Sequence, residues 1–182
     1  MYEPSIRVPM IAHCPELIPK AIKPKEMVLN IDVAPTFLEL AGIANPPKMH
    51  GQSLVPVMRG NAPNWRKDFV YEYEWERDYP YTPSITGLRT EQYSLMLSHG
   101  VWDIEELYDV QKDPDQKNNL LADVWNNYQR GRTIEVIKDP KLKALVTALQ
   151  KRLAEILKTT GGDPRRADRT AGAAHIHHDD FL

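Results

Sequence analysis

Apolar residues follow two different patterns along the chain, and the change falls near Trp65. Before it, Arg7–His13 is a short, mostly apolar run, which is typical of a buried parallel strand. Asp32–Ala41 carries apolar residues at helical spacing. A buried strand needs neighbours on both sides, and residues 1–6 are too few to supply one. We therefore predict that residues 1–62 form the end of a parallel α/β layer whose earlier part lies outside this sequence.

The helix predicted at Asp32–Ala41 has recognisable ends. Asp32 is placed to cap its first turn, and Pro35 lies within that turn. Gly42 follows the last turn and can end the helix in a left-handed conformation. The apolar residues of this helix fall on one side: Val33, Phe37, Leu38, Leu40 and Ala41.

Beyond Trp65 the pattern changes to the alternation that is typical of strands. Four short segments predict strands: Phe69–Trp75, Ile85–Arg89, Tyr93–Ser98 and Glu106–Val110. The second and third are joined by three residues, a link typical of a β-hairpin. Short links between successive strands predict an antiparallel sheet.

The strongest helical signal is Pro140–Lys158. Asp139 can cap this helix, and Gly161 is placed to end it. Its apolar stripe consists of Leu142, Leu145, Val146, Leu149, Leu153, Ile156 and Leu157. Such a helix covers one face of a sheet. We therefore predict an antiparallel-sheet subdomain over residues 63–160 and a tail over residues 161–182 that does not fold.

Composition narrows the class of protein. Of the 182 residues, 42% are hydrophobic and 26% are charged, as in ordinary globular domains. A net charge of −2 gives no basic field that would attract nucleic acid or an anionic membrane. No stretch approaches the roughly 18 apolar residues of a transmembrane helix. We therefore expect neither nucleic acid nor a membrane as a partner, and the single cysteine excludes an internal disulfide.

His50 and Arg89 are the candidates for substrate binding. His50 precedes Gly51 in a loop and could contact a substrate at the rim of a pocket; the alternative is an ordinary turn residue. Arg89, on the predicted hairpin, could bind an anionic sugar, or it could anchor a loop by pairing with a carboxylate. We predict no catalytic residue and no metal ligand in this chain.

Three other features favour a structural interpretation. Cys14 follows the predicted strand and is interpreted as a small apolar residue rather than a nucleophile. The aromatic stripe Tyr71, Tyr73 and Trp75 predicts the sheet face under the last helix rather than a carbohydrate platform. The tail segment His175–Asp180 has metal-binding atoms, but no scaffold that would fix their geometry.

Five motifs occur in one order along residues 2–121. They are Tyr2–Ile11, Asn30–Ile43, His50–Pro56 (His-Gly-Gln-Ser-Leu-Val-Pro), Leu88–Tyr93 (Leu-Arg-Thr-Glu-Gln-Tyr), and Glu106–Val110 followed by Asp113-Pro114 and Asn119-Leu120. Together they resemble the C-terminal portion of the type I sulfatase (arylsulfatase) family. The resemblance implies an alkaline-phosphatase-like sulfatase fold. This chain would hold the end of its parallel α/β layer, followed by a four-stranded antiparallel sheet packed by a C-terminal helix.

The resemblance also implies an activity, sulfuric ester hydrolysis by the complete protein. The substrate would be a sulfated carbohydrate or an aryl sulfate, and the cofactors would be calcium and a formylglycine. In the family, formylglycine forms within a Cys/Ser-x-Pro-x-Arg signature, whereas Cys14 is followed by Pro15-Glu16-Leu17-Ile18. We therefore expect this chain to be inactive alone, and its partner to be the missing N-terminal half of a sulfatase.

Two alternatives remain open at this point. The chain could be a stand-alone binding or interaction module derived from the sulfatase C-terminal subdomain. It could also be part of a related phosphonate or phosphate ester hydrolase, because that superfamily shares the scaffold.

The resemblance implies that the parent protein is periplasmic or secreted.

Overall fold

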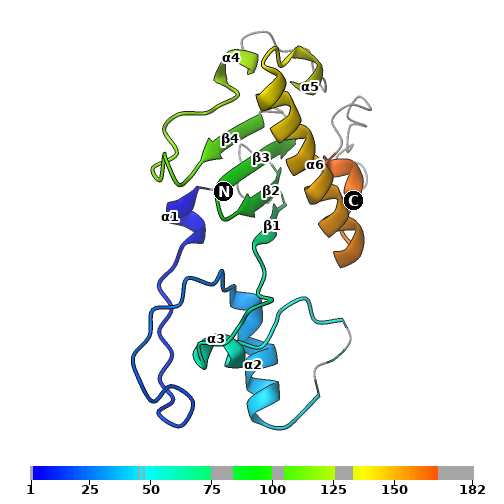
Figure 1. Cartoon of the computed structure of the whole chain (residues 1–182). Coiled ribbons are helices and arrows are strands. Elements are labelled where there is room, and N and C mark those ends of the chain that lie inside the picture. Colours follow the sequence, from blue (N-terminus) through cyan, green and yellow to red (C-terminus); the bar gives the residue numbers. More distant parts are fainter. Residues whose placement is uncertain are drawn as a thin grey trace. The chain divides into compact units, whose positions relative to one another are not determined.

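A computed structural model of the chain describes residues 2–44, 46, 48–74, 84–99, 105–125 and 133–167. The chain divides into two compact units (Figure 1). The sheet unit comprises Met1–Arg7 and Asp68–Leu182, and the small unit comprises Val8–Lys67. The first seven residues thus group with the sheet, unlike the predicted division at residue 62. Among the described helices, none combines the length and apolar character needed to cross a membrane.

The sheet unit contains four antiparallel strands, as predicted. They are β1 (Asp68–Tyr73), β2 (Ser84–Thr90), β3 (Tyr93–His99) and β4 (Glu105–Asp109), hydrogen-bonded in the order β1-β2-β3-β4 (Figure 1). The hairpin between β2 and β3 is fixed by Thr90, whose Oγ1 accepts a hydrogen bond of 2.8 Å from the backbone N–H of Tyr93. The link of two residues between β2 and β3 favours the pairing of these two strands as a hairpin.

The predicted C-terminal helix is α6 (Pro140–Thr160). The Asp139 carboxylate caps it by accepting a bond of 2.8 Å from Lys141 N, and Gly161 ends it with φ of 82°. The helix packs on one face of the sheet in Figure 1. Its contact cluster includes Leu88, Leu95, Leu97, Leu107, Val146, Leu149, Leu153 and Leu157. Each fully buried leucine contributes roughly 1.5–3 kcal/mol of transfer free energy, so this face forms the core of the unit.

The aromatic side chains of β1 lie on the sheet face opposite α6. Val70 packs against the cluster under α6, whereas Tyr71 packs with Met96 and Tyr108 on the other face. The prediction that Tyr71 and Tyr73 lie under the last helix is therefore wrong, and Trp75 lies outside the described residues. The face of β1 that meets α6 carries Val70 between the acidic residues Asp68 and Glu72. Alternation alone therefore favours the aromatic face, and the contacts made by residues far along the chain decide which face meets the helix.

The prediction of a strand at Arg7–His13 is also wrong. The chain instead begins with a short helix, α1 (Glu3–Ile6), and residues 7–14 have no strand among the described residues. Val8 and Ile11 are 71% and 94% exposed. A strand requires a hydrogen-bonded neighbour, and no described segment pairs with this one.

The small unit is built around α2 (Val33–Leu40), preceded by the 3₁₀ turn η1 (Asn30–Asp32) and followed by α3 (Val55–Met58). Gly42 ends α2 with φ of 71°, as predicted, and its N–H bonds to the carbonyl of Glu39. The Asp32 side chain does not cap α2, contrary to the prediction, because its carboxylate is occupied elsewhere.

The remaining elements are α4 (Ala122–Trp125), α5 (Thr133–Val136) and the 3₁₀ turn η2 (Pro164–Ala167). The turn η2 lies where we predicted an unfolded tail. Ala167 is 1% exposed and belongs to the cluster under α6. Arg166 forms an ion pair with Glu74, the residue that follows β1. These contacts order the start of the predicted tail, and residues 168–182 lie outside the described residues.

Candidate functional site

Arg89 and His50, the two predicted substrate-binding residues, lie in different units. Arg89 stands on β2, on the face opposite α6. Its Nε donates to Glu3 Oε1 over 2.7 Å, and both side chains are 14% exposed. Its Nη1 also donates to the carbonyl of Thr90. The structure therefore shows the anchoring arrangement that was the alternative for Arg89, and a substrate role stays a prediction.

The partner of Arg89 belongs to a segment that we call the N-terminal clasp, residues Tyr2–Ile6. The backbone N–H of Glu3 donates to Gln116 Oε1 over 2.6 Å. Ile6, at the other end of the clasp, packs with Met96, Tyr108 and Val110. The clasp thus covers part of the sheet face opposite α6 and explains why residues 1–7 group with the sheet unit.

Two tyrosines of this face share one carboxylate. Tyr2 and Tyr108 donate to Glu106 Oε2 over 2.8 and 2.9 Å, and their rings pack edge to face with centroids 6.2 Å apart. Burial, followed by the neighbouring carboxylate, raises the pKa of Tyr108 and of Tyr2. Both phenols therefore remain protonated donors near neutral pH.

The loop that carries His50 is fixed by the backbone of the residues after it. A side chain at Gly51 would place its Cβ only 2.0 Å from the carbonyl oxygen of Ile31, so the two backbones are in close contact. The N–H of Gln52 donates to Asp32 Oδ1 over 2.9 Å, and the N–H of Leu54 donates to Thr36 Oγ1 over 2.8 Å. His50 itself is exposed at the edge of this anchored loop.

Asp32 is the centre of the small unit. It is completely buried, and its carboxylate accepts bonds from the N–H of Leu29 (2.7 Å), the N–H of Gln52 and both Nη atoms of Arg66. Sequence reasoning missed this pair because it assigned Asp32 to a local helix cap. Arg66 lies more than thirty residues away in sequence, and no local signal joins the two residues.

Trp65 is held beside this ion pair. Its indole Nε1 donates to the carbonyl of Met27 over 2.8 Å, and the same carbonyl accepts from Arg66 Nη1 over 3.3 Å. The Arg66 guanidinium carbon lies 4.9 Å from the centre of the Trp65 ring, within the range of a cation–π contact. The Trp65 ring is therefore held by the hydrogen bond of its indole N–H and by the guanidinium of Arg66.

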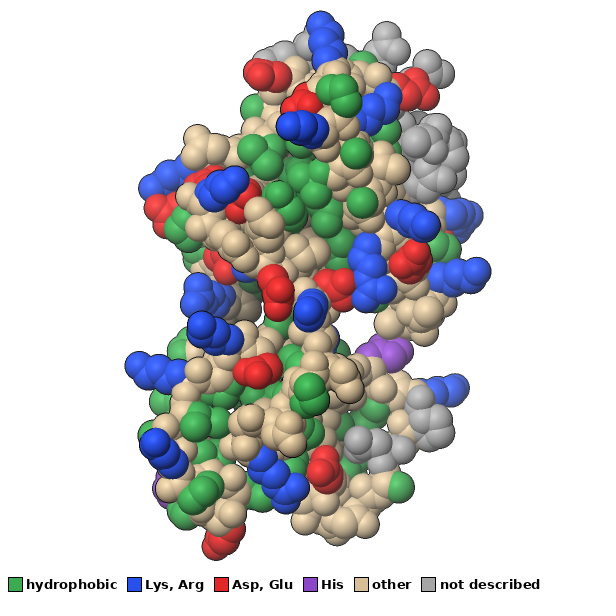
Figure 2. All heavy atoms as spheres, viewed as in Figure 1, with side chains coloured by type: hydrophobic (Ala, Val, Ile, Leu, Met, Phe, Trp, Pro, Cys, Tyr) green, Lys and Arg blue, Asp and Glu red, His purple; other side chains and the backbone are tan. Residues whose placement is uncertain are grey.

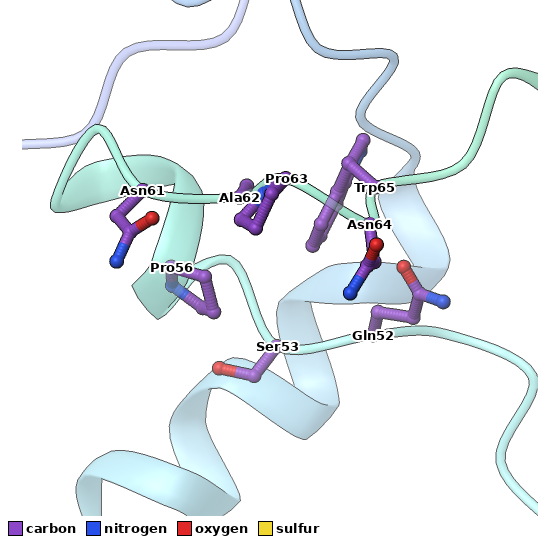
Figure 3. Close-up of a pocket in the computed structure, with 8 residues that line it drawn as sticks. All are labelled: Gln52, Ser53, Pro56, Asn61, Ala62, Pro63, Asn64 and Trp65. Atoms are coloured by element: carbon purple, nitrogen blue, oxygen red, sulfur yellow. The ribbon is translucent and has the colours of Figure 1, made fainter.

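A shallow pocket of about 420 Å³ lies next to Trp65. Figure 3 shows Pro56, Asn64 and Trp65 arranged around one open space. The residues that line the pocket are Gln52, Ser53, Pro56, Asn61, Ala62, Pro63, Asn64 and Trp65. All eight are uncharged, so the pocket combines apolar surface with side-chain amides and a hydroxyl.

The described residues offer no metal site. None of their His, Cys, Asp and Glu side chains gather in groups of three or more that could hold an ion. The expectation that calcium is bound by the complete protein, and not by this chain, stays a prediction. Cys14 is half-buried, with its thiol 3.7 Å from Glu16 Oε2, and the segment His175–Asp180 lies outside the described residues.

Comparison with known proteins gives a family match over most of the chain. Residues 1–130 match the family model described as N-sulphoglucosamine sulphohydrolase, C-terminal. The chain is 36% identical over 128 residues to an N-acetylglucosamine-6-O-sulfatase of Bacteroides thetaiotaomicron, covering 67% of this chain and 22% of that protein. It is 28% identical over 154 residues to the human N-acetylglucosamine-6-sulfatase, covering 68% of this chain and 28% of that protein.

Two solved structures that resemble this chain are likewise those of a sulfatase and of a protein that binds a sulfated sugar. One, of a protein in complex with its substrate D-glucosamine-2-N,6-O-disulfate, has a TM-score of 0.61 and 27% identity, and the match covers 79% of this chain and 27% of that one. Another, of a 2-O glycosaminoglycan sulfatase, has a TM-score of 0.52 and 25% identity, with 83% and 32% covered. The chain spans about a quarter of the length of the curated relatives named above. By its matched family model and these relatives, the chain belongs to the sulfatase family, in the region that its members carry at the C-terminal end.

Proposed function

We propose that this chain is the C-terminal part of a sulfuric ester hydrolase that acts on sulfated carbohydrate. The observation that carries the proposal is the family match over residues 1–130. Relatives named as N-acetylglucosamine sulfatases support a sulfated amino sugar as the substrate class. The catalytic portion of a sulfatase is then the partner of this chain.

The surface of the small unit supports such a partner. Along α2, the side chains of Val33, Phe37 and Leu40 are 37%, 67% and 49% exposed, whereas Pro35 and Thr36 are buried. Figure 2 shows apolar side chains reaching the surface of this unit between lysines and arginines. Burial of one large apolar side chain contributes roughly 1.5–3 kcal/mol, so a partner covering this side of α2 would gain several kcal/mol.

The chemistry of sulfate-ester cleavage explains why a partner is needed. The sulfuryl group in transfer requires a positioned nucleophile and fixed positive charge. Cys14 lies outside a formylglycine signature, and the described residues gather no metal-binding group. The share of this chain in the reaction is therefore to complete the fold and to position substrate, while the nucleophile and calcium belong to the catalytic portion.

The first test is an assay of the purified chain with 4-nitrophenyl sulfate and with N-acetylglucosamine 6-sulfate, with and without calcium. We expect no turnover above background. Calcium-dependent turnover that disappears in Cys14→Ala would refute the proposal.

The second test examines the partner. The chain should bind the catalytic portion of the Bacteroides N-acetylglucosamine-6-O-sulfatase prepared without its own C-terminal region. Phe37→Asp should weaken this binding strongly, because it places a charge in the apolar side of α2. Leu120→Asp is the matched control, since Leu120 is a 41%-exposed apolar residue of the sheet unit. Equal effects of the two substitutions would contradict the assignment of α2 as the contact surface.

A further inference from the structure

We propose that the pocket beside Trp65 binds the uncharged face of a pyranose ring. The site lies wholly within the small unit, and it is formed by the loop after His50 and by the segment 61–65. The choice of carbohydrate as ligand class rests on the proposed function, but the site itself involves none of the groups that would cleave a sulfate ester.

The lining of the pocket has the chemistry of a neutral sugar site. A pyranose presents hydroxyl groups around its edge and C–H groups on its faces. Side-chain amides can both donate to and accept from hydroxyls, and Asn64 offers such an amide beside the open space in Figure 3. The indole of Trp65 and the ring of Pro56 offer flat apolar surface to the C–H groups.

Trp65, the backbone of Gln52 and Ser53 are held in place before any ligand binds. The indole N–H of Trp65 is bonded to Met27, and Arg66 lies against its ring. The backbone of Gln52 is bonded to the buried carboxylate of Asp32. Ser53 Oγ accepts a bond of 3.3 Å from Val55 N, which leaves the hydroxyl hydrogen available to donate. Such preorganisation reduces the entropic cost of binding a small ligand.

The charges around the pocket favour the neutral part of a glycan over its sulfate. Arg66, which follows Trp65 in sequence, donates to both carboxylate oxygens of Asp32 and to the carbonyl of Met27, so its positive charge is already matched. The lining side chains add no charge of their own. A volume of about 420 Å³ lies within the range of roughly 300–1,000 Å³ that is typical of small-molecule sites.

The test is a titration of the ¹⁵N-labelled chain with N-acetylglucosamine, followed through the four tryptophan indole signals. The Trp65 signal is assigned from its disappearance in Trp65→Phe. We expect the Trp65 signal to shift in a saturable way while the other three indoles stay unchanged. Asn64→Ala should weaken binding about fivefold, which corresponds to the loss of one neutral hydrogen bond. Ser53→Ala should have a smaller effect in the same direction.

The matched control is Asn118→Ala, because Asn118 is an exposed asparagine of the sheet unit. Its affinity for N-acetylglucosamine should equal that of the unmodified chain. The proposal is overturned if the Trp65 signal does not move, if Asn64→Ala binds as the control does, or if glucosamine 6-sulfate shifts Trp65 while N-acetylglucosamine does not. Because this titration requires no turnover, its failure is distinguishable from failure of the proposed hydrolase function.

Discussion

Removal of the Arg89 side chain should destabilise the sheet unit by about 2 kcal/mol. Arg89 and Glu3 are both 14% exposed, and the bond between them is 2.7 Å long. A hydrogen bond between charged groups contributes about 1.5–3 kcal/mol. In Arg89→Ala the Glu3 carboxylate keeps its buried position but loses its cation, and water reaches only a small part of its surface. We place the loss in the middle of that range because the pair is not completely buried.

The measurement is urea unfolding followed by circular dichroism at 222 nm, which reports mainly on α6, the longest described helix. With a slope of roughly 1–3 kcal/mol per molar urea, the midpoint should fall by about 1 M. Glu3→Ala should give a similar loss. The double variant should lose less than the two single losses together, by about 2 kcal/mol, because both single variants remove the same interaction.

The control is Lys117→Ala. Lys117 pairs with Asp115 over the same distance of 2.7 Å, but the two side chains are 74% and 68% exposed. Exposed pairs contribute little to stability, so its urea midpoint should scarcely change. If Arg89→Ala shifts the midpoint no more than Lys117→Ala, the clasp does not stabilise the sheet unit, and the substrate-binding interpretation of Arg89 gains support.

Three further substitutions test the small unit and the sheet. Asp32→Asn should destabilise the small unit by about 3–5 kcal/mol, because it leaves the Arg66 charge without its partner, and the Trp65 indole N–H should exchange faster. Gly51→Ala should expose Val8–Lys67 to limited proteolysis, because its Cβ would force two backbone segments apart at a cost of about 3 kcal/mol. Gly60→Ala meets no atom within 4 Å and costs only the strain of an alanine at φ of 68°, about 1 kcal/mol, so its effect should be smaller. The hydrogen bond from Gln92 lowers the pKa of Asp109. The stability that the Asp109 carboxylate contributes is therefore present above about pH 4 and is lost as the pH falls through the folded pKa. The difference in urea midpoint between Asp109→Asn and the unmodified chain should accordingly shrink below about pH 4.

Much of the sheet unit is predictable because its signals are local. The helix predicted at Pro140–Lys158 is observed at Pro140–Thr160, since its cap at Asp139 and its left-handed end at Gly161 depend only on neighbouring residues. The strands follow from the local alternation of residues, and the hairpin of β2 and β3 follows from the short link between them. The face occupied by Tyr71 was not predictable, because Val70 and Tyr71 are both apolar and the choice between them is made by packing far away in sequence.

The errors in the N-terminal part come from contacts that no local pattern contains. Arg7–His13 has the composition of a buried strand, but strand formation depends on a hydrogen-bonded neighbour. Asp32 stands where a cap is expected, yet Arg66 and the N–H of Gln52 take its carboxylate. The pocket beside Trp65 was not predicted either, because the position of Trp65 depends on the long-range ion pair of Asp32 and Arg66.

The clasp has one further consequence for the energetics of the chain. The clasp lies before Val8–Lys67 in sequence and the rest of the sheet unit lies after it. The small unit is therefore connected at both of its ends to segments of the sheet unit. For a flexible loop of about 60 residues, closing such a ring costs (3/2)RT ln n, or about 3–4 kcal/mol. When the small unit is folded, its own contacts already fix the path between the two ends, and the clasp has to offset less of this entropy. We therefore expect that a substitution that unfolds the small unit, such as Asp32→Asn, leaves the clasp to close a flexible loop and so lowers the urea midpoint of the sheet unit as well. The stabilities of the two units are therefore linked through the chain itself, and the contacts of Tyr2, Glu3 and Ile6 are the means by which that link is made.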